Sequence, residues 1–206
     1  MRLNTHGGDL ANTVFCSTIR ARRLLRSGIL PAMVSALDFR IAAQPDDVSC
    51  GPTCLHGVYR HFGDRVELPA LIDEVRMLDE GGTLDVFLAN HALERGYRVS
   101  LFTYNLQLFD PTWFELPRER LSERLEAQAK AKPDRKLKLA TRGYLRFLEL
   151  GGQLRFEDLS PALIRRYLKR DVPIITGLSA TYLYREAREL PDREVEDDVG
   201  GLSLIH

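Results

Sequence analysis

The sequence predicts an α+β fold, because helical patterns come first along the chain and strand-like runs gather late. Its 206 residues suffice for one well-buried domain, with or without a short appendage. Apolar content of 44% and charged content of 28% are ordinary for a globular protein. Helices and strands do not alternate regularly, so a regular βαβ repeat is not expected.

Spacing and breaker residues define the elements in the first half of the domain. Alternating apolar residues predict a short strand over residues 37–41. Apolar residues at helical spacing predict three helices, over residues 50–62, 68–75 and 83–95. Gly96 follows the last of these, at the position where a left-handed residue commonly ends a helix. Residues 97–104 are rich in β-branched and aromatic side chains and predict a strand.

The second half is predicted to begin with helices and to end with strands. Its three helices are expected over residues 118–132, 140–150 and 160–170. The last begins with Ser160-Pro161, a capping hydroxyl followed by proline at the first helical position. The apolar run 172–178 predicts a buried strand and residues 181–184 predict the next one, whereas the acidic stretch 186–198 predicts a loop.

Residues 1–33 differ in composition from the rest of the chain. They carry five arginines against a single acidic residue, Asp9. Such a segment can be a basic arm or a targeting peptide. The alternative, which we favour, is an unstructured extension translated from a start codon upstream of Met33. We therefore expect a disordered basic extension at residues 1–33 and one domain at residues 34–206.

Charge and hydropathy argue against several classes of partner. The 29 basic and 29 acidic residues give a net charge of zero. The overall charge therefore gives no reason to expect binding to nucleic acid or to an anionic membrane. Apolar runs stay short of the roughly 20 residues that a membrane span needs. Three cysteines are too few for a disulfide framework, which fits a cytoplasmic protein. The sequence predicts no particular oligomeric state.

A thiol at a predicted helix start is the feature that carries chemistry. In QPDDVSCGPTC, Gly51-Pro52 lets the chain turn tightly into the helix and exposes Cys50. A helix N-terminus lowers the pKa of a thiol and so favours the nucleophilic thiolate. Gln44 lies six residues upstream, where a loop can fold back and supply the donor that an acyl-transfer oxyanion needs. The sequence therefore predicts a cysteine-dependent hydrolase.

The second cysteine of this segment has a different predicted role. Cys54 lies within the apolar stripe of the helix and is expected in the core. Cys50 and Cys54 have a spacing that suits a metal pair, but no second Cys/His pair at finger-like spacing completes four ligands. We expect no metal and no organic cofactor.

The segment QPDDVSCGPTCL resembles the nucleophile motif of papain-like cysteine peptidases, specifically the bacteriocin-leader-processing (double-glycine peptidase) type and its stand-alone bacterial relatives. Similar segments are GGTLDVFLANHALERGY, FDPTWF, GGQLRFEDLSPALIRRYLKR and VPIITGLSATYLYRE, so that the resemblance covers roughly residues 37–201. It implies a nucleophile helix packed on an antiparallel sheet and a peptide or protein substrate. It also implies that Cys50 forms a thioester acyl-enzyme, while Gln44 and the Cys50 backbone N–H stabilise the oxyanion.

The family carries its catalytic base later, as a histidine that usually follows a glycine and precedes an orienting Asp or Asn. His206 falls near that position, but no glycine precedes it and it is the last residue. The resemblance therefore implies a C-terminally truncated domain whose last strands are missing. The other histidines are poorer candidates: His56 and His61 share the helix of Cys50, His91 is predicted mid-helix, and His6 lies in the basic segment.

Three functions are compatible with these features. The first is hydrolysis of a peptide or other amide bond, impaired by the truncation. The second is a catalytically inactive relic that binds peptides in the former substrate groove. The third is transpeptidation, in which an amine or thiol accepts the acyl group, as in papain-like synthases.

Overall fold

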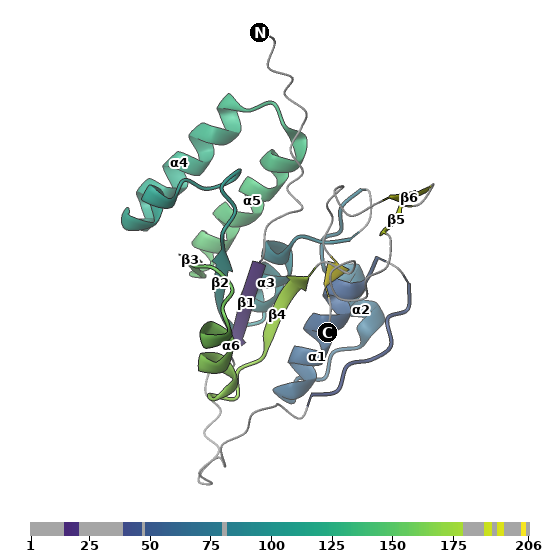
Figure 1. Ribbon diagram of the computed structural model, residues 1–206. Coiled ribbons are helices and arrows are strands. Elements are labelled where there is room, and N and C mark those ends of the chain that lie inside the picture. Colours follow the sequence, from purple (N-terminus) through teal and green to yellow (C-terminus); the bar gives the residue numbers. More distant parts are fainter. Residues whose placement is uncertain are drawn as a thin grey trace.

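A mixed five-stranded sheet forms the centre of the computed structural model, in the order β3-β2-β1-β4-β7 (Figure 1). The structure describes residues 15–20, 39–46, 48–79, 82–178, 188–190, 193–195 and 203–204. The strands of the sheet are β1 (Phe15–Arg20), β2 (Arg98–Thr103), β3 (Gln153–Phe156), β4 (Ile174–Leu178) and β7 (Ser203–Leu204). β2 and β3 run parallel, and the other neighbours are antiparallel.

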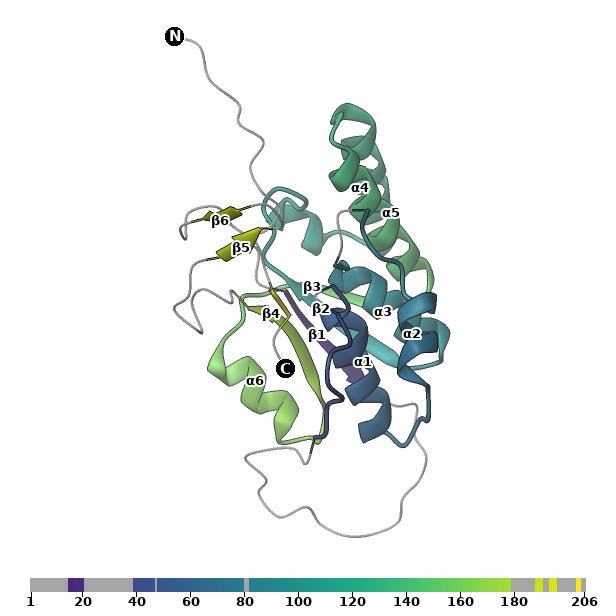
Figure 2. The same ribbon diagram turned by 90° about the vertical axis from the view of Figure 1, so that its right-hand side faces the viewer.

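Helices cover both faces of this sheet, with α1, α2 and α3 on one side and α6 on the other (Figure 2). The helices are α1 (Cys50–His61), α2 (Leu68–Glu74), α3 (Asp85–Glu94), α4 (Arg118–Ala131), α5 (Arg135–Glu149) and α6 (Pro161–Leu168), with a 3-10 turn η2 (Pro111–Glu115). Helix α3 packs on β1 and β2, and α5 packs on α3. This mixture of helix and strand agrees with the expected α+β class.

Strand β1 lies in the middle of the sheet, which corrects the expectation that residues 1–33 are an unstructured extension. It pairs with β2 from Phe15↔Thr103 to Arg20↔Arg98, and with β4 on its other side. Ile19 is 1% exposed and belongs to the main core. The expectation failed because it rested on the composition of the whole segment, which does not reveal pairing with distant strands. The rest of residues 1–33 lies outside the described residues.

Three further expectations of local structure are wrong. Residues 39–41 are irregular rather than a strand. The sheet is not purely antiparallel, because β3, which the sequence did not indicate, pairs parallel to β2. A short hairpin of β5 (Arg188–Leu190) and β6 (Arg193–Val195) stands where a loop was expected. The strand predicted at residues 181–184 lies outside the described part of the chain.

The predicted helices are confirmed, and side-chain caps explain the starts of α5 and α6. Ser160 accepts a hydrogen bond from the backbone N–H of Leu163 at 3.1 Å, as its capping role requires. Asp134 does the same for Leu137 at 2.8 Å and thereby starts α5 earlier than predicted. Gly96 has a φ of 85°, so it ends α3 in the left-handed conformation expected for it.

A chain that starts at Met33 lacks β1 and is expected to lose cooperative folding. β2 and β4 would each lose a partner, and the cost exceeds the roughly 5–15 kcal/mol that a domain has in hand. In the full chain, Ile19→Ala should lower the free energy of unfolding by about 2–5 kcal/mol. Urea denaturation followed by circular dichroism measures both effects. A chain lacking residues 1–11 keeps β1 and is the control; an undisturbed transition in the shorter chain would contradict the role of β1.

Asp85 opens α3 with one carboxylate oxygen fully buried. Burial raises the pKa of this carboxyl to about 7. Its neighbour Tyr144 is buried too, and burial followed by the charge of Asp85 raises the pKa of that hydroxyl well above its ordinary value. Ionisation of Asp85 therefore opposes folding.

The free energy of unfolding should fall by on the order of 3 kcal/mol between about pH 4 and pH 7 through Asp85 alone. The unfolded chain releases this proton near pH 4, whereas the folded protein keeps it to about pH 7, so raising the pH favours unfolding. Asp85→Asn should remove that decline and be the more stable protein at pH 8. Asp73→Asn, a change at an exposed acid on α2, is the control. Parallel pH profiles for the native chain and Asp85→Asn would disprove this.

Candidate active site

Cys50 is the first residue of α1, and its side chain is half-buried. The nine residues that follow it, 51–59, are all buried. The first N–H groups of an α-helix have no acceptor within the helix, so the backbone N–H of Cys50 faces out at the positive end of the helix dipole. The first intrahelical bond at this end runs from the Thr53 N–H to the Ser49 carbonyl, at 3.0 Å. The thiol therefore sits at the N-terminal end of a buried helix.

The loop before α1 is held by the side chain of Asp46. Its Oδ1 accepts hydrogen bonds from the backbone N–H groups of Val48 and Ser49, at 2.9 and 2.8 Å. These bonds, that of Val48 first, lower the pKa of the Asp46 carboxyl. The Nε2 of Gln44 donates to the backbone carbonyl of Asp46. Gln44 and Cys50 thus lie at the two ends of one hydrogen-bonded loop.

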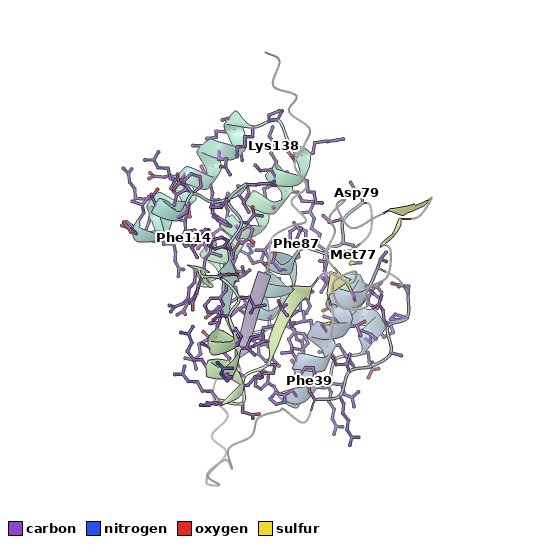
Figure 3. The ribbon with its side chains drawn as sticks, in the orientation of Figure 1. Phe39, Met77, Asp79, Phe87, Phe114 and Lys138 are labelled. Carbon is purple, nitrogen blue, oxygen red and sulfur yellow. The ribbon has the colours of Figure 1, made fainter. Side chains whose placement is uncertain are left out.

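The segment 39–46 packs along α1 before it reaches this loop. Near the C-terminal end of the helix, the rings of Phe39 and His61 lie 5.8 Å apart between centroids (Figure 3). The segment approaches so closely at Gly57 that a Cβ there would lie 2.9 Å from the Phe39 ring and 3.2 Å from Ile41. The missing side chain of Gly57 therefore lets this segment run beside the helix toward Cys50.

Cys54 lies one turn beyond Cys50 and belongs to the core, as the sequence predicts. It is 5% exposed. Burial, followed by the charge of Cys50, raises the pKa of the Cys54 thiol to about 12. Within the described ranges, no group of three or more His, Cys, Asp or Glu side chains is placed to hold a metal ion.

The described histidines do not form a pair with Cys50. His56 is buried within α1. His61 lies 3.5 Å from the carboxylate of Asp171. His206, the expected base, lies outside the described residues. Strand β7, which ends two residues before it in the sequence, pairs with β4 and also contacts α1.

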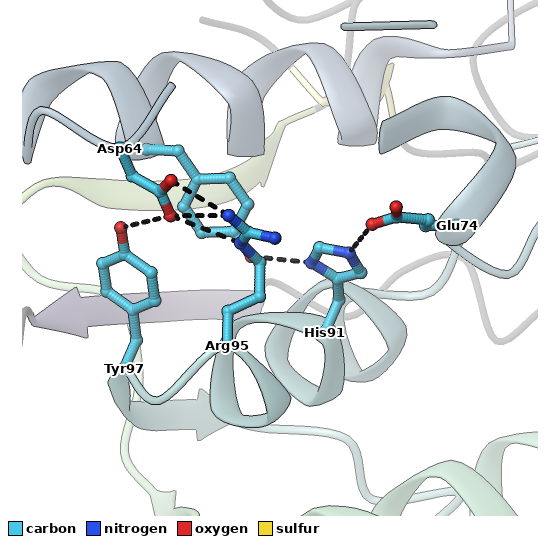
Figure 4. A network of polar contacts seen from close by, with 6 residues as sticks. Asp64, Glu74, His91, Arg95 and Tyr97 are labelled. Carbon is cyan, nitrogen blue, oxygen red and sulfur yellow. Dashed lines mark hydrogen bonds and ion pairs between the residues drawn. The ribbon is translucent and has the colours of Figure 1, made fainter. Parts of the chain in front are cut away.

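His91 is bound at both ring nitrogens and belongs to a polar network that the sequence did not reveal (Figure 4). Its Nε2 lies 3.0 Å from the Glu74 carboxylate, which can only accept, so Nε2 carries the proton. Its Nδ1 lies 2.7 Å from the Tyr59 hydroxyl. His91 links α1, α2 and α3 and is not free to act as a base.

A second half of the same network ties the end of α1 to the end of α3. Arg95 donates to both carboxylate oxygens of Asp64, at 2.9 and 3.0 Å, and the Tyr97 hydroxyl donates to the same carboxylate at 3.0 Å. The Arg95 guanidinium also lies 5.3 Å from the centre of the Tyr59 ring. The sequence signal for this network was the i, i+4 spacing of His91 and Arg95, because residues at that spacing share one helix face.

Comparisons with known protein families, with curated proteins and with solved structures find no match for this chain. In the described part of the chain, no helix is both long and apolar enough to cross a membrane.

Iodoacetamide at pH 8 should label Cys50 in the folded protein and leave Cys54 unlabelled. Cys54 is buried and its thiol keeps its proton at this pH, whereas Cys50 is accessible. Peptide mass spectrometry after timed quenching gives the two rates, which we expect to differ by at least roughly a hundredfold. Unfolding in urea should bring the two rates together, which is the control. Equal labelling in the folded state would show that the helix start is not built as described.

Proposed function

We propose that this chain is a thiol-dependent peptidase or related amide-bond hydrolase with a papain-like fold, of the double-glycine peptidase type, and that Cys50 is its nucleophile. The observation that carries the proposal is the position of Cys50 as the accessible first residue of a buried helix. Helix α1 starts at the thiol and lies with other helices on one face of the sheet. This arrangement also suits a papain-like domain. A free thiol nucleophile is suited to a reducing cytoplasm.

Each step of the reaction has a candidate group at this end of α1. The Cys50 thiolate attacks the carbonyl carbon of the substrate, and the carbonyl oxygen takes up the negative charge. The backbone N–H of Cys50 is one donor to this oxygen. The Gln44 amide has two N–H bonds and gives one to the Asp46 carbonyl, which leaves the second for the oxyanion.

Proton transfer needs a base, and we assign it to His206. The amine leaves with a proton from the imidazolium as the C–N bond breaks, and water then hydrolyses the thioester to release the acid and restore the thiol. Strand β7, which ends two residues before His206 in the sequence, contacts α1 and pairs with β4. By resemblance, the substrate is a peptide or protein, with a leader ending in two glycines as the first to try.

One observation favours a second candidate, an inactive peptide-binding relic. Of the histidines that the structure describes, His61 and His91 are engaged by acidic partners and His56 lies within the buried helix. A working base must therefore come from outside the described residues, where His206 is the candidate that the resemblance implies. If His206 does not reach Cys50, the loop of Gln44 and helix α1 would bind a peptide without cleaving it.

Hydrolysis of double-glycine peptides, read by mass spectrometry, tests the proposal directly. Cys50→Ala should abolish the activity, and Gln44→Ala should lower kcat by roughly 10²–10³-fold, because one oxyanion donor is lost. Gln107→Ala, an exposed glutamine on a different loop, should leave kcat unchanged.

His206→Ala separates the two candidates. In an enzyme it should lower kcat and slow labelling of Cys50 by a peptidyl electrophile at neutral pH. If the native chain binds the peptides without cleaving them, and His206→Ala leaves labelling unchanged, the relic is correct. Cleavage that survives in Cys50→Ala would overturn both.

A further inference from the structure

A hollow of about 450 Å³ opens where β2 and β3 begin, and it shares no residue with α1 or with the loop of Gln44. The ends of α3, α5 and α6 complete its wall. Its lining residues are Leu93, Tyr97, Arg98, Val99, Ser100, Leu150, Gly151, Gln153, Arg155, Tyr167, Arg170 and Val172. Its volume lies in the range of small-molecule sites.

Three arginines line this hollow, and no acidic side chain is among its lining residues. Arg98 comes from β2, Arg155 from β3, and Arg170 from just beyond α6. Within the described ranges, none of the three forms an ion pair. This positive charge is local, because the whole chain has a net charge of zero.

Acidic residues near these arginines in sequence contact other side chains, and Glu157, two residues after Arg155, lies 3.6 Å from Arg166. Glu94 and Glu149 both contact Arg146, at 3.1 and 3.5 Å. Asp171 directly follows Arg170 but lies 3.5 Å from the ring of His61. Like charges gathered around one space oppose folding. Such an arrangement is expected where an anionic ligand supplies the missing charge.

Polar groups suited to orienting such a ligand lie between the arginines. The Ser100 hydroxyl donates to the side-chain oxygen of Gln153 at 3.2 Å, across the parallel strand pair. The side-chain amide N–H groups of Gln153 are donors as well. Tyr167 adds an aromatic wall, packed edge-to-face on Phe102 beneath it. The hollow thus combines donors, three exposed guanidinium groups and an apolar surface.

We propose that this hollow binds a phosphate-bearing small molecule. Guanidinium groups present paired donors that match phosphate oxygens, and three of them from separate elements can contact one phosphate or diphosphate group from several sides. A concave space fits a small ligand better than a nucleic acid, which would need an extended basic stripe. The proposal does not depend on catalysis by Cys50.

Isothermal titration calorimetry of the full chain with inorganic pyrophosphate tests the site. We expect saturable one-to-one binding that Arg98→Gln, Arg155→Gln and Arg170→Gln each weaken by roughly tenfold or more, since each change removes a charge-assisted bond. Arg60→Gln changes the charge equally at an exposed position on α1 and should leave the affinity unchanged. Arg155→Lys keeps the charge but loses the paired donors, so it should bind more weakly than the native chain. Circular dichroism confirms that each variant is folded.

Several outcomes would overturn the proposal. Absence of saturable binding, or equal weakening by Arg60→Gln, would mean that the hollow is no site. Citrate binding as tightly as pyrophosphate would show that carboxylates serve as well, and phosphate recognition would be wrong. A serine-phosphorylated peptide could bind more tightly than pyrophosphate and lose binding in the same variants. That result would show that the ligand is a phosphorylated protein, and the small-molecule proposal would be wrong.

Discussion

Helix α1 is buried along nine consecutive residues, and the candidate site depends on that burial. The buried residues 51–59 directly follow Cys50, whose own side chain is half-buried. The enclosure requires a close contact at Gly57, where the segment leading to Gln44 passes against the helix. One packing contact therefore positions both the thiol and the amide proposed to act with it.

The polar network of His91 shows how the same packing limits the chemistry. Burial raises the pKa of the Tyr59 hydroxyl, so that this group stays a donor at physiological pH. Its partner ring, that of His91, is held between Tyr59 and Glu74. A histidine fixed in this way joins three helices. A histidine that lies close to the nucleophile helix is therefore not, for that reason alone, available as a base.

The sequence predicted the features that short-range chemistry determines. The Gly-Pro step after Cys50, the hydroxyl of Ser160 and the glycine at position 96 each act within a few residues, and the structure confirms the helix ends that they predict. Strand β1 could not be predicted in this way, because its partners lie near residues 100 and 175. The arginine hollow is drawn from three separate elements and has no local pattern either. Whether His206 reaches Cys50 likewise depends on long-range pairing.

The central position of β1 has a consequence for the order of folding during synthesis. This strand leaves the ribosome before its partners, because β2 and β4 lie much later in the chain. At roughly 5–20 residues per second, the nascent chain carries an unpaired strand for several seconds. The pairing of β1 on both of its sides therefore waits until β4 has emerged. Folding is then late and dominated by contacts distant in sequence, which makes it slow and exposes the unfinished chain to aggregation unless a chaperone covers it.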